Sequence, residues 1–426
     1  MIVPQDAIEG RARVESKRRI RLLFFVKEPF PTHRVDVDVL FGQELLSRGH
    51  EIDFVLQAAT EDAPTGPQVW RGRTVWVGAT DAKEGFLHRL HKHLLDVWHD
   101  LKALRLLSSG RYDAVQVRDK LLVAAVAVVL ARRKRLKFFY WLSFPHAEAQ
   151  VRRALDGTAR YAALSYLQGR VSAWVLYRWI LPRSTHVFVQ SEQMRKDVCV
   201  HGISPSRLTP VPMGIADDEF LAIDGLSAAP GVRNSQHMTL AYLGTLSAQR
   251  RLEMLVDMLK LIRLHGIEAK LLLVGDGQRP EDRLRLECRA SELGIHEHLE
   301  ITGFLPRSEA LSRVSQAQVC LSPFFPTPIL RSTSPTKLVE YLALGLPVVA
   351  NDHPEQRRAL RESRAGVCVP WGARHFARAV KWLMKLDDDE REAMGRRGRS
   401  WVLERRTYGK IAAELEAKYF ELLVRS

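Results

Sequence analysis

Two runs of alternating strand-like and helix-like segments constrain the fold of this chain more than any other feature. Short, strongly apolar segments alternate with segments of helical periodicity, and the alternation is interrupted once, at 221–236, where glycines and a proline break the pattern. Strands that are separated by helices pair in parallel, so each run predicts a doubly wound parallel sheet. The sequence therefore predicts an α/β protein with domains at 1–225 and 226–405, and a final helix within 406–426.

The individual elements follow from the same patterns. In the first domain, strands are expected at 21–26, 51–56, 74–77, 112–117, 137–142 and 186–190, and helices at 37–47 and 86–107. In the second domain, strands are expected at 239–243, 269–274, 299–302, 318–322 and 347–350, and helices at 251–265 and 283–293. The helix at 86–107 has leucines and Trp98 on one face and Arg89, Lys92 and Asp100 on the other, which makes it amphipathic.

Cysteine usage and hydropathy indicate where the protein works. The four cysteines lie far apart without a Cys-x-x-Cys pair, which argues against a zinc ribbon and against a disulfide framework. The first residues lack the order of charge, apolar core and small residues of a signal peptide. The longest apolar run, 121–131, is much shorter than the roughly 20 residues that cross a bilayer. We expect a cytoplasmic protein without a membrane span.

The net charge of +15 implies an acidic partner, which could be nucleotide phosphates, nucleic acid or anionic lipid. The segment 151–183 has six arginines against the single acid Asp156, interleaved with tyrosines and tryptophans. This composition is typical of a helix that lies on an anionic membrane surface. The alternative is a helix whose aromatic residues pack inward. A nucleic-acid partner rests on net charge alone, without a recognisable binding module, and is not expected.

The stretch 335–352 is the most informative for chemistry. It predicts a short helix that contains Glu340, ends at Gly345 and leads into a strand. A helix N-terminus can hold phosphate through its free N–H groups, and a carboxylate one turn further in can accept hydrogen bonds from vicinal hydroxyls. Phosphate and ribose together indicate a nucleotide. The alternative is an ordinary helix–strand unit whose glutamate is only solvated.

A second candidate loop lies at 243–251. Gly244 directly follows a strand and permits a tight turn, and the helix expected near Arg251 aims its N-terminus and two guanidinium groups into the same space. Arg250 is the candidate for binding a pyrophosphate, although a salt bridge to a neighbour would explain it equally well. The loop 274–278, with Gly275 and Gly277, is a weaker signal that a simple turn also explains.

The order of these segments resembles the retaining GT-B glycosyltransferases of the family 4 type, known as glycosyl transferases group 1. In the second domain, the resemblance rests on Gly244 and Arg250 and on the segments 272–277, 302–304 and 337–349. The first domain adds similar landmarks at 49–53, 188–192 and 211–216. The resemblance implies two Rossmann-like domains that face a cleft, and a hexosyl-type transfer with retention that requires no metal and no cofactor.

The resemblance also implies roles for individual residues. Glu340 would bind the ribose of a nucleotide-diphosphate sugar, the amides of Lys337 and Leu338 its diphosphate, and Arg250 would neutralise the leaving group. The catalytic residues implied are Arg250, Lys337 and His146. The donor-binding residues implied are Glu340, Gly244, Thr245, Gly275, Gly277, Gly303, Phe304, Ser332, Thr333 and Leu338, with Gly303 and Phe304 against the base.

Two positions depart from the family pattern. The usual second glutamate, eight residues before Glu340, is Ser332, and the usual arginine after Gly244 is Thr245. The hydroxyls at 332–334 could bind the sugar or phosphate instead, and Arg331 or Lys337 could replace the missing cation. Alternatively, the chain has lost catalysis and kept binding.

The histidines of the first domain have two possible roles. His146 follows a strand and opens the arginine-rich segment, so it should reach the donor sugar or the acceptor hydroxyl, unless it only caps a helix. His88, His91 and His99 lie near one helical face while His93 points elsewhere, and no cysteine or carboxylate completes a metal site.

The sequence thus favours a cytoplasmic, peripherally membrane-attached glycosyltransferase that acts on a glycan or lipid-linked acceptor at the inner membrane face, in polysaccharide or glycolipid synthesis. The alternatives are a catalytically inactive sugar-nucleotide-binding scaffold of a polysaccharide assembly complex, and a nucleotide-sugar epimerase of the same fold. The final helix, 408–423, is expected to cross back to the first domain, so its truncation should impair domain closure.

Overall fold

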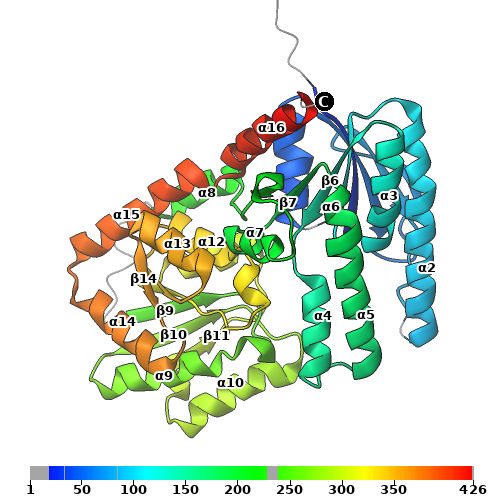
Figure 1. The fold of residues 1–426 in the computed structure, drawn as a ribbon. Helices are drawn as coiled ribbons and strands as arrows, with labels where there is room; N and C mark the ends of the chain where they lie inside the picture. The colour runs from blue at the N-terminus through cyan, green and yellow to red at the C-terminus, as the bar shows by residue number, and fades with distance from the viewer. Residues whose placement is uncertain (1–18, 33, 84, 228–237, 425–426) are drawn as a thin grey trace, which may run out of the picture.

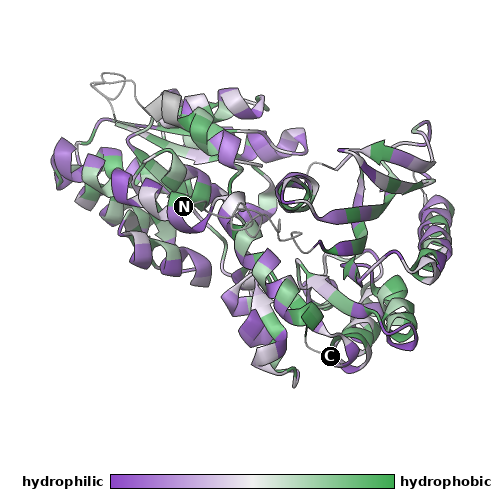
Figure 2. Cartoon of the chain, turned by 90° about the horizontal axis from the view of Figure 1, so that it is seen from above, coloured by the Kyte–Doolittle hydropathy of each residue, from purple (hydrophilic) through white to green (hydrophobic). Residues whose placement is uncertain are grey.

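The computed structural model describes residues 19–32, 34–83, 85–227 and 238–424, which form two α/β lobes (Figures 1 and 2). The first sheet has eight strands in the order β3-β4-β2-β1-β5-β6-β7-β8, all parallel except for the β3–β4 pair. Its strands are β1 (Arg21–Phe30), β2 (Glu51–Ala58), β3 (Gly66–Trp70), β4 (Arg73–Gly78), β5 (Ala114–Arg118), β6 (Lys137–Leu142), β7 (His186–Val189) and β8 (Leu208–Pro210).

The second sheet is wholly parallel, with six strands in the order β11-β10-β9-β12-β13-β14. Its strands are β9 (Met238–Leu243), β10 (Ala269–Val274), β11 (Leu299–Ile301), β12 (Val319–Ser322), β13 (Val348–Asn351) and β14 (Gly366–Val369). The chain runs outward from β9 to β11 and then returns to pair β12 with the other side of β9, so the strand order reverses between β9 and β12. In parallel sheets a ligand binds beyond the carboxyl ends of the strands at such a point. The predicted fold class is confirmed.

Helices cover both faces of each sheet. In the first domain they are η2 (Asp36–Glu44), α1 (Leu45–Ser47), α2 (Phe86–Ala103), η3 (Leu104–Ser109), α3 (Leu121–Arg133), α4 (His146–Leu155), α5 (Ala162–Trp174), η4 (Val175–Ile180), α6 (Leu181–Arg183), α7 (Glu192–Cys199) and η5 (Pro205–Arg207). The later helices are α8 (Asp217–Ser227), η6 (Ala248–Arg250), α9 (Glu253–Leu264), α10 (Pro280–Glu292), η7 (His296–His298), α11 (Arg307–Ser315), η8 (Leu330–Ser332), α12 (Thr336–Ala343), α13 (Pro354–Ser363), α14 (Ala373–Lys385), α15 (Asp388–Arg405) and α16 (Tyr408–Val424). None of the helices in the described part of the chain is long and apolar enough to cross a bilayer.

The first sheet separates two cores because successive side chains of a strand point to opposite faces. Leu22 and Phe24 of β1 pack with η2 and α16 on one face, whereas Leu23 and Phe25 pack with α3, η4 and α7 on the other. The second domain has one continuous core around β9–β13. The final helix α16 therefore packs on the first domain, and Tyr419 donates a hydrogen bond to Gln116 of β5 at 2.5 Å (Figure 1).

The expectation of an unstructured linker at 221–236 is wrong for its first part. Residues 217–227 form α8, whose first turn carries Asp217, Asp218 and Glu219, charges that suit a helix N-terminus. Phe220 and Ile223 of α8 are buried in the core of the second domain. The glycine and proline signals obscured this helix, and the rest of the expected linker, 228–236, lies outside the described residues.

Helix α2 has its apolar face turned to solvent. Leu87, Leu94 and Trp98 are 75%, 60% and 64% exposed, whereas Asp100 on the opposite face is buried. Lys120, also buried, pairs with Asp100 and with Asp96 at 2.8 Å each. The amphipathic pattern predicted the helix correctly, but it does not indicate which face is buried. Here the ion-pair cluster decides that the polar face is buried.

Candidate functional site

Glycines bring three loops of the second domain together at the carboxyl ends of β9, β10 and β11. Gly244 follows β9 with φ +133°, and a side-chain carbon on it would lie 2.4 Å from the Lys337 ammonium nitrogen. Gly275 follows β10 with φ +135°, and a side-chain carbon there would lie 2.4 Å from the carbonyl oxygen of Gly244. Gly275 also forms an antiparallel bridge with Gly303, which follows β11. Gly275 is needed because the Gly244 backbone lies too close for a side chain, and the positive φ values of Gly244 and Gly303 favour glycine there.

Lys337 lies in the first turn of α12, at the point where the strand order of the sheet reverses. Its ammonium group donates a hydrogen bond to the Tyr242 hydroxyl at 2.7 Å and lies 4.3 Å from the centre of that ring. Burial lowers the pKa of Lys337 well below its usual value, and the nearby Arg250 guanidinium lowers it further, although Glu340 acts in the opposite direction. Neither Lys337 nor Arg250 forms an ion pair with a carboxylate of the described residues.

Arg250 is the last residue of η6, and its side chain lies beside this site. Burial raises the pKa of Tyr242 to about 12, and the neighbouring Arg250 guanidinium acts against that rise. The helix expected near Arg251 is present as α9, which begins at Glu253, but the expectation of two guanidinium groups at its tip is wrong. Arg251 has a left-handed φ of +53° and turns away to lie 5.4 Å over the Phe325 ring. The site therefore has one arginine from this loop.

Glu340 lies one turn after Lys337 and is 7% exposed. Its Oε1 forms an ion pair with Arg307 of α11 at 2.9 Å, which leaves Oε2 to accept from a ligand hydroxyl. Arg307 also pairs with Glu219 of α8. Burial alone would lower the pKa of Arg307, but the two glutamates raise it above its usual value. The sequence analysis missed Arg307; its place in the first turn of the helix after the Gly303 loop is the signal that could have indicated it.

The remaining residues predicted to bind the donor differ in their contacts and in their exposure. The Thr245 carbonyl accepts from the Tyr242 hydroxyl at 3.3 Å, and Gly277 packs against Asp282, which binds the Ala248 amide at 2.8 Å. The side chain of Leu338 is buried in the core, so only its backbone faces the helix N-terminus, and Phe304 is 71% exposed. These placements leave the donor-binding role of Thr245, Gly277, Leu338 and Phe304 as a prediction.

Ser332 and its neighbours join the two domains. The Ser332 hydroxyl donates to Asp197 of α7, and its carbonyl oxygen accepts from the Ser191 hydroxyl at 2.6 Å. Ser334 accepts from the Met213 amide at 3.0 Å, whereas the Thr333 hydroxyl donates within its own turn to the Leu330 carbonyl. The serine that replaces the usual glutamate thus connects to the first domain.

A cleft of about 790 Å³ lies between the domains beside these contacts, bounded by α7 and α13. Three of its cations, Lys196, Arg331 and Arg361, form no ion pair within the described ranges. Two of its acids are already neutralised, since Glu355 pairs with Arg406 at 3.3 Å and Asp352 with Arg357. The cleft therefore carries excess positive charge and suits an anionic ligand.

His146 is the first residue of α4, after β6. Its Nε2 lies 3.8 Å from a carboxylate oxygen of Asp119, which follows β5 and is buried. Burial opposes ionisation of Asp119, but His146 and Arg118 outweigh it and lower its pKa. No contact in the described structure joins His146 to Arg250 or Lys337.

Three histidines of α2 bind groups of the protein itself. His88 and His91 each bind the same oxygen of Asp81, at 2.9 and 2.8 Å, and His99 bonds to the Trp76 carbonyl oxygen at 3.2 Å. Across the described residues, no group of three or more histidines, cysteines or carboxylates is placed to hold a metal ion.

Two doubly wound domains with a cleft between them form the GT-B fold, and the second domain carries a cationic site at its strand ends. The chain belongs to the glycosyl transferases group 1: it matches that family over residues 228–401 and the glycosyl transferase 4-like domain over residues 41–214.

Curated relatives cover part of the chain. It is 30% identical over 153 residues to a phosphatidyl-myo-inositol mannosyltransferase of Mycobacterium leprae, matching 35% of this chain and 38% of the relative. It is 26% identical over 210 residues to a GDP-mannose-dependent alpha-(1-6)-phosphatidylinositol monomannoside mannosyltransferase of Mycobacterium tuberculosis, matching 48% of this chain and 54% of the relative. The matches span less than two thirds of either relative.

Solved structures match the fold over nearly the whole chain. A sucrose-phosphate synthase from Thermosynechococcus elongatus superposes with a TM-score of 0.69 at 18% identity, covering 96% of this chain and all of that one. The Anabaena protein HepE in complex with UDP superposes with a TM-score of 0.67 at 14% identity, covering 94% of this chain and all of that one.

Proposed function

We propose that this protein transfers a sugar from a nucleotide-diphosphate donor, with retention, to a lipid-linked or glycan acceptor at the cytoplasmic face of a membrane. The observation that carries the proposal is a pair of neighbouring cations near the N-terminus of α12, Lys337 and Arg250, which form no ion pair with a carboxylate in the described ranges. The free N–H groups of the helix, its dipole and both cations point to one space and together suit a diphosphate.

The same two cations would drive the chemistry. As the glycosidic bond breaks, negative charge develops on the leaving diphosphate, and preformed cations stabilise that charge without reorganisation. The lowered pKa of Lys337 fits this role, because a bound diphosphate would favour its protonated form. Two protein cations can thus neutralise the leaving group, so we propose a reaction without metal or cofactor.

Glu340 would bind the ribose. Its free Oε2 can accept a hydrogen bond from a hydroxyl, while Arg307 fixes the carboxylate through Oε1. Gly303, which follows β11 at the same end of the sheet, would let the base approach the backbone. The HepE structure contains UDP, and two of the relatives are named as GDP-mannose-dependent, which supports a nucleotide-sugar donor.

His146 would act on the donor sugar or the acceptor hydroxyl. Asp119, which stays ionised beside it, would stabilise the charge of a protonated imidazole and fix its orientation. Half of the His146 side chain is accessible. This geometry supports proton transfer at the first-domain side of the cleft.

A lipid-linked acceptor fits the outer surface of α4 and α5. Arg152, Arg153, Arg160 and Arg170 lie among apolar side chains that are largely exposed, with Leu164 at 60% and Trp174 at 62%. The aromatic residues thus do not all pack inward, and exposed rings among arginines suit the head-group region of an anionic membrane. The curated relatives are named for phosphatidylinositol acceptors, which supports a lipid as the acceptor.

Calorimetric titration with UDP- and GDP-sugars tests the donor site. Glu340→Gln should weaken donor binding by about 1.5–3 kcal/mol, which is roughly 10- to 150-fold, because it removes a charged hydrogen-bond acceptor. Glu219→Gln is the matched control, since it removes the other partner of Arg307 and leaves Glu340 in place. Equal donor affinity of wild type and Glu340→Gln would show that this carboxylate does not bind the donor.

A catalytically inactive sugar-nucleotide binder is the second candidate. The engagement of the Ser332 hydroxyl with Asp197, away from Lys337, favours it. This candidate predicts donor binding without transfer to lipid extracts and without donor hydrolysis. Donor hydrolysis by the wild type would exclude it.

A further inference from the structure

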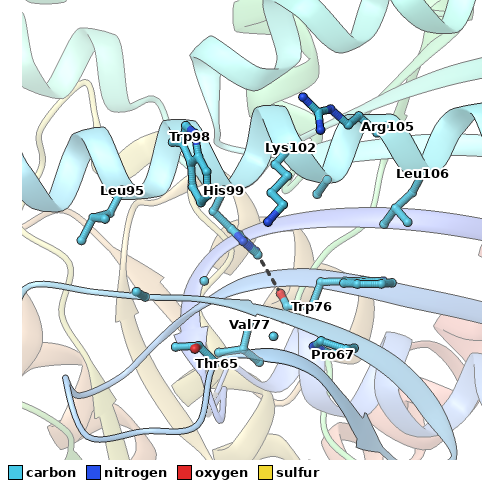
Figure 3. A pocket seen from close by; sticks show the side chains of 14 residues that line it. Thr65, Pro67, Trp76, Val77, Leu95, Trp98, His99, Lys102, Arg105 and Leu106 are labelled. Carbon is cyan, nitrogen blue, oxygen red and sulfur yellow. Dashed lines mark hydrogen bonds between the residues drawn. The ribbon is translucent and has the colours of Figure 1, made fainter.

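Helix α2 and the edge of the first sheet enclose a pocket that the proposed reaction does not use. The pocket has a volume of about 440 Å³ and lies between the second half of α2 with η3 and the β3–β4 hairpin. Leu95, Leu106, Val77 and Pro67 form apolar walls, and Trp76 and Trp98 contribute rings (Figure 3). This volume and lining are typical of a small-molecule site.

The charges around the pocket select its ligand. None of its 14 lining residues is acidic, and three of them, His99, Lys102 and Arg105, are basic. Lys102 extends from α2 toward the strands, whereas Arg105 points away from them (Figure 3). Lys102 lies 5.0 Å over the Trp98 ring and forms no ion pair within the described parts of the chain. A ligand with an apolar body and an anionic head would complement both the walls and this cation.

The surface around the pocket is unusually apolar for a helix layer that faces solvent. The exposed stripe of α2 contains Leu87, Leu90, Leu94, Trp98 and Leu101, and Trp98 also lines the pocket. Neighbouring α3 adds Leu122, which is 61% exposed, and α3 in turn contacts η4, which continues α5. In Figure 1 these helices lie in one layer over the first sheet. Large apolar side chains exposed together in this way mark an interaction site.

We propose that the pocket holds one hydrocarbon chain of an anionic membrane phospholipid, with the phosphate of its head group on Lys102. The proposal rests on the membrane-facing part of the proposed function, because a phospholipid chain reaches the pocket from a membrane surface. The Trp76 ring lines the pocket, so a chain that enters the pocket lies against it. The exposed stripe of α2 would lie among the head groups on either side.

Fluorescence quenching by vesicles of phosphatidylcholine and phosphatidylglycerol with brominated chains tests the pocket directly, since bromine quenches only tryptophans that the chain reaches. The difference between wild type and Trp76→Phe gives the signal of Trp76. Ala79→Phe fills the rim of the pocket, because Ala79 is exposed and lines it. Ala82→Phe is the matched control, since Ala82 is exposed three residues further on and does not line the pocket.

We expect brominated vesicles to quench Trp76 in wild type and in Ala82→Phe, and not in Ala79→Phe. Lys102→Gln should reduce affinity for anionic vesicles about fivefold and leave neutral vesicles unaffected. Equal quenching of Trp76 in Ala79→Phe and wild type, or vesicle binding without any quenching of Trp76, would overturn the proposal. Donor hydrolysis is measured in every variant: its absence from wild type would contradict the proposed function while leaving the quenching result to decide the pocket.

Discussion

The two domains build their sites in different ways. In the second domain the site consists of glycine backbones and two cations at the ends of adjacent strands, above a single apolar core. In the first domain charged side chains are buried between elements far apart in sequence. Arg118, 1% exposed, pairs with Glu28 at 2.6 Å and Asp36 at 2.9 Å, and Lys120 pairs with Asp96 and Asp100. The second domain therefore depends on backbone geometry at its site, and the first domain depends on specific buried ion pairs.

The largest effect should come from breaking a buried charge cluster of the first domain. Lys120→Met leaves Asp96 and Asp100 buried without their cation, and we expect a loss of about 3–5 kcal/mol in the free energy of unfolding. Because burial raises the pKa of Asp100 to about 6 in the folded state, its proton favours folding at low pH, and this contribution is lost as the pH rises through about 6. The loss in the free energy of unfolding of Lys120→Met should therefore be larger at pH 8 than at pH 5.

Urea unfolding monitored separately for the two domains measures this deficit. Lys134→Met is the control, because Lys134 is an exposed cation at the end of α3. A loss below about 1 kcal/mol at pH 8 for Lys120→Met would mean that the first domain does not depend on this cluster, and the contrast between the domains would fail.

A smaller effect, on kcat and not on stability, is expected from a change in the second domain. Arg250→Ala should lower kcat about 10²- to 10³-fold, because it removes a preformed charge from the site of the leaving diphosphate. Arg251→Ala is a matched control from the next position, since Arg251 lies over Phe325 instead. Steady-state kinetics with a nucleotide sugar measure both. Similar losses of kcat in the two variants would contradict a specific role of Arg250, because they would show that removing either positive charge from this loop has the same effect.

The sequence predicted the second domain best because its constraints are local. The strand 269–274 begins and ends as expected, since it is a short apolar run within a parallel sheet. Gly244, Gly275, Gly303 and Lys337 were predicted one by one, and the structure brings them together because parallel strands end at the same edge. Arg250 lies beside them.

The sequence predicted the first domain less well because tertiary contacts decide it. Nothing local indicates that the apolar side of α2 faces outward, since that depends on Lys120 pairing with Asp96 and Asp100. The short antiparallel strand β3 and the hydrogen bond of Ser332 to Asp197 depend likewise on partners distant in sequence. Arg251 was misplaced for a related reason, because its left-handed backbone ends the turn before α9 and a helical pattern cannot reveal this.

The smallest effect concerns Ser332, where the two domains meet. If the Ser332 hydroxyl holds the domains together through Asp197, Ser332→Ala and Asp197→Ala should each lower kcat/KM about fivefold, because each removes a hydrogen bond of roughly 1 kcal/mol. The double variant should then lose no more kcat/KM than either single variant. If the hydroxyl binds the donor instead, Ser332→Ala alone should weaken donor affinity and its effect should add to that of Asp197→Ala. Kinetics and donor titration of the four proteins decide between these outcomes. Non-additive losses in kcat/KM with unchanged donor affinity would show that the residue in place of the usual glutamate connects the domain built on ion pairs to the domain built on backbone geometry.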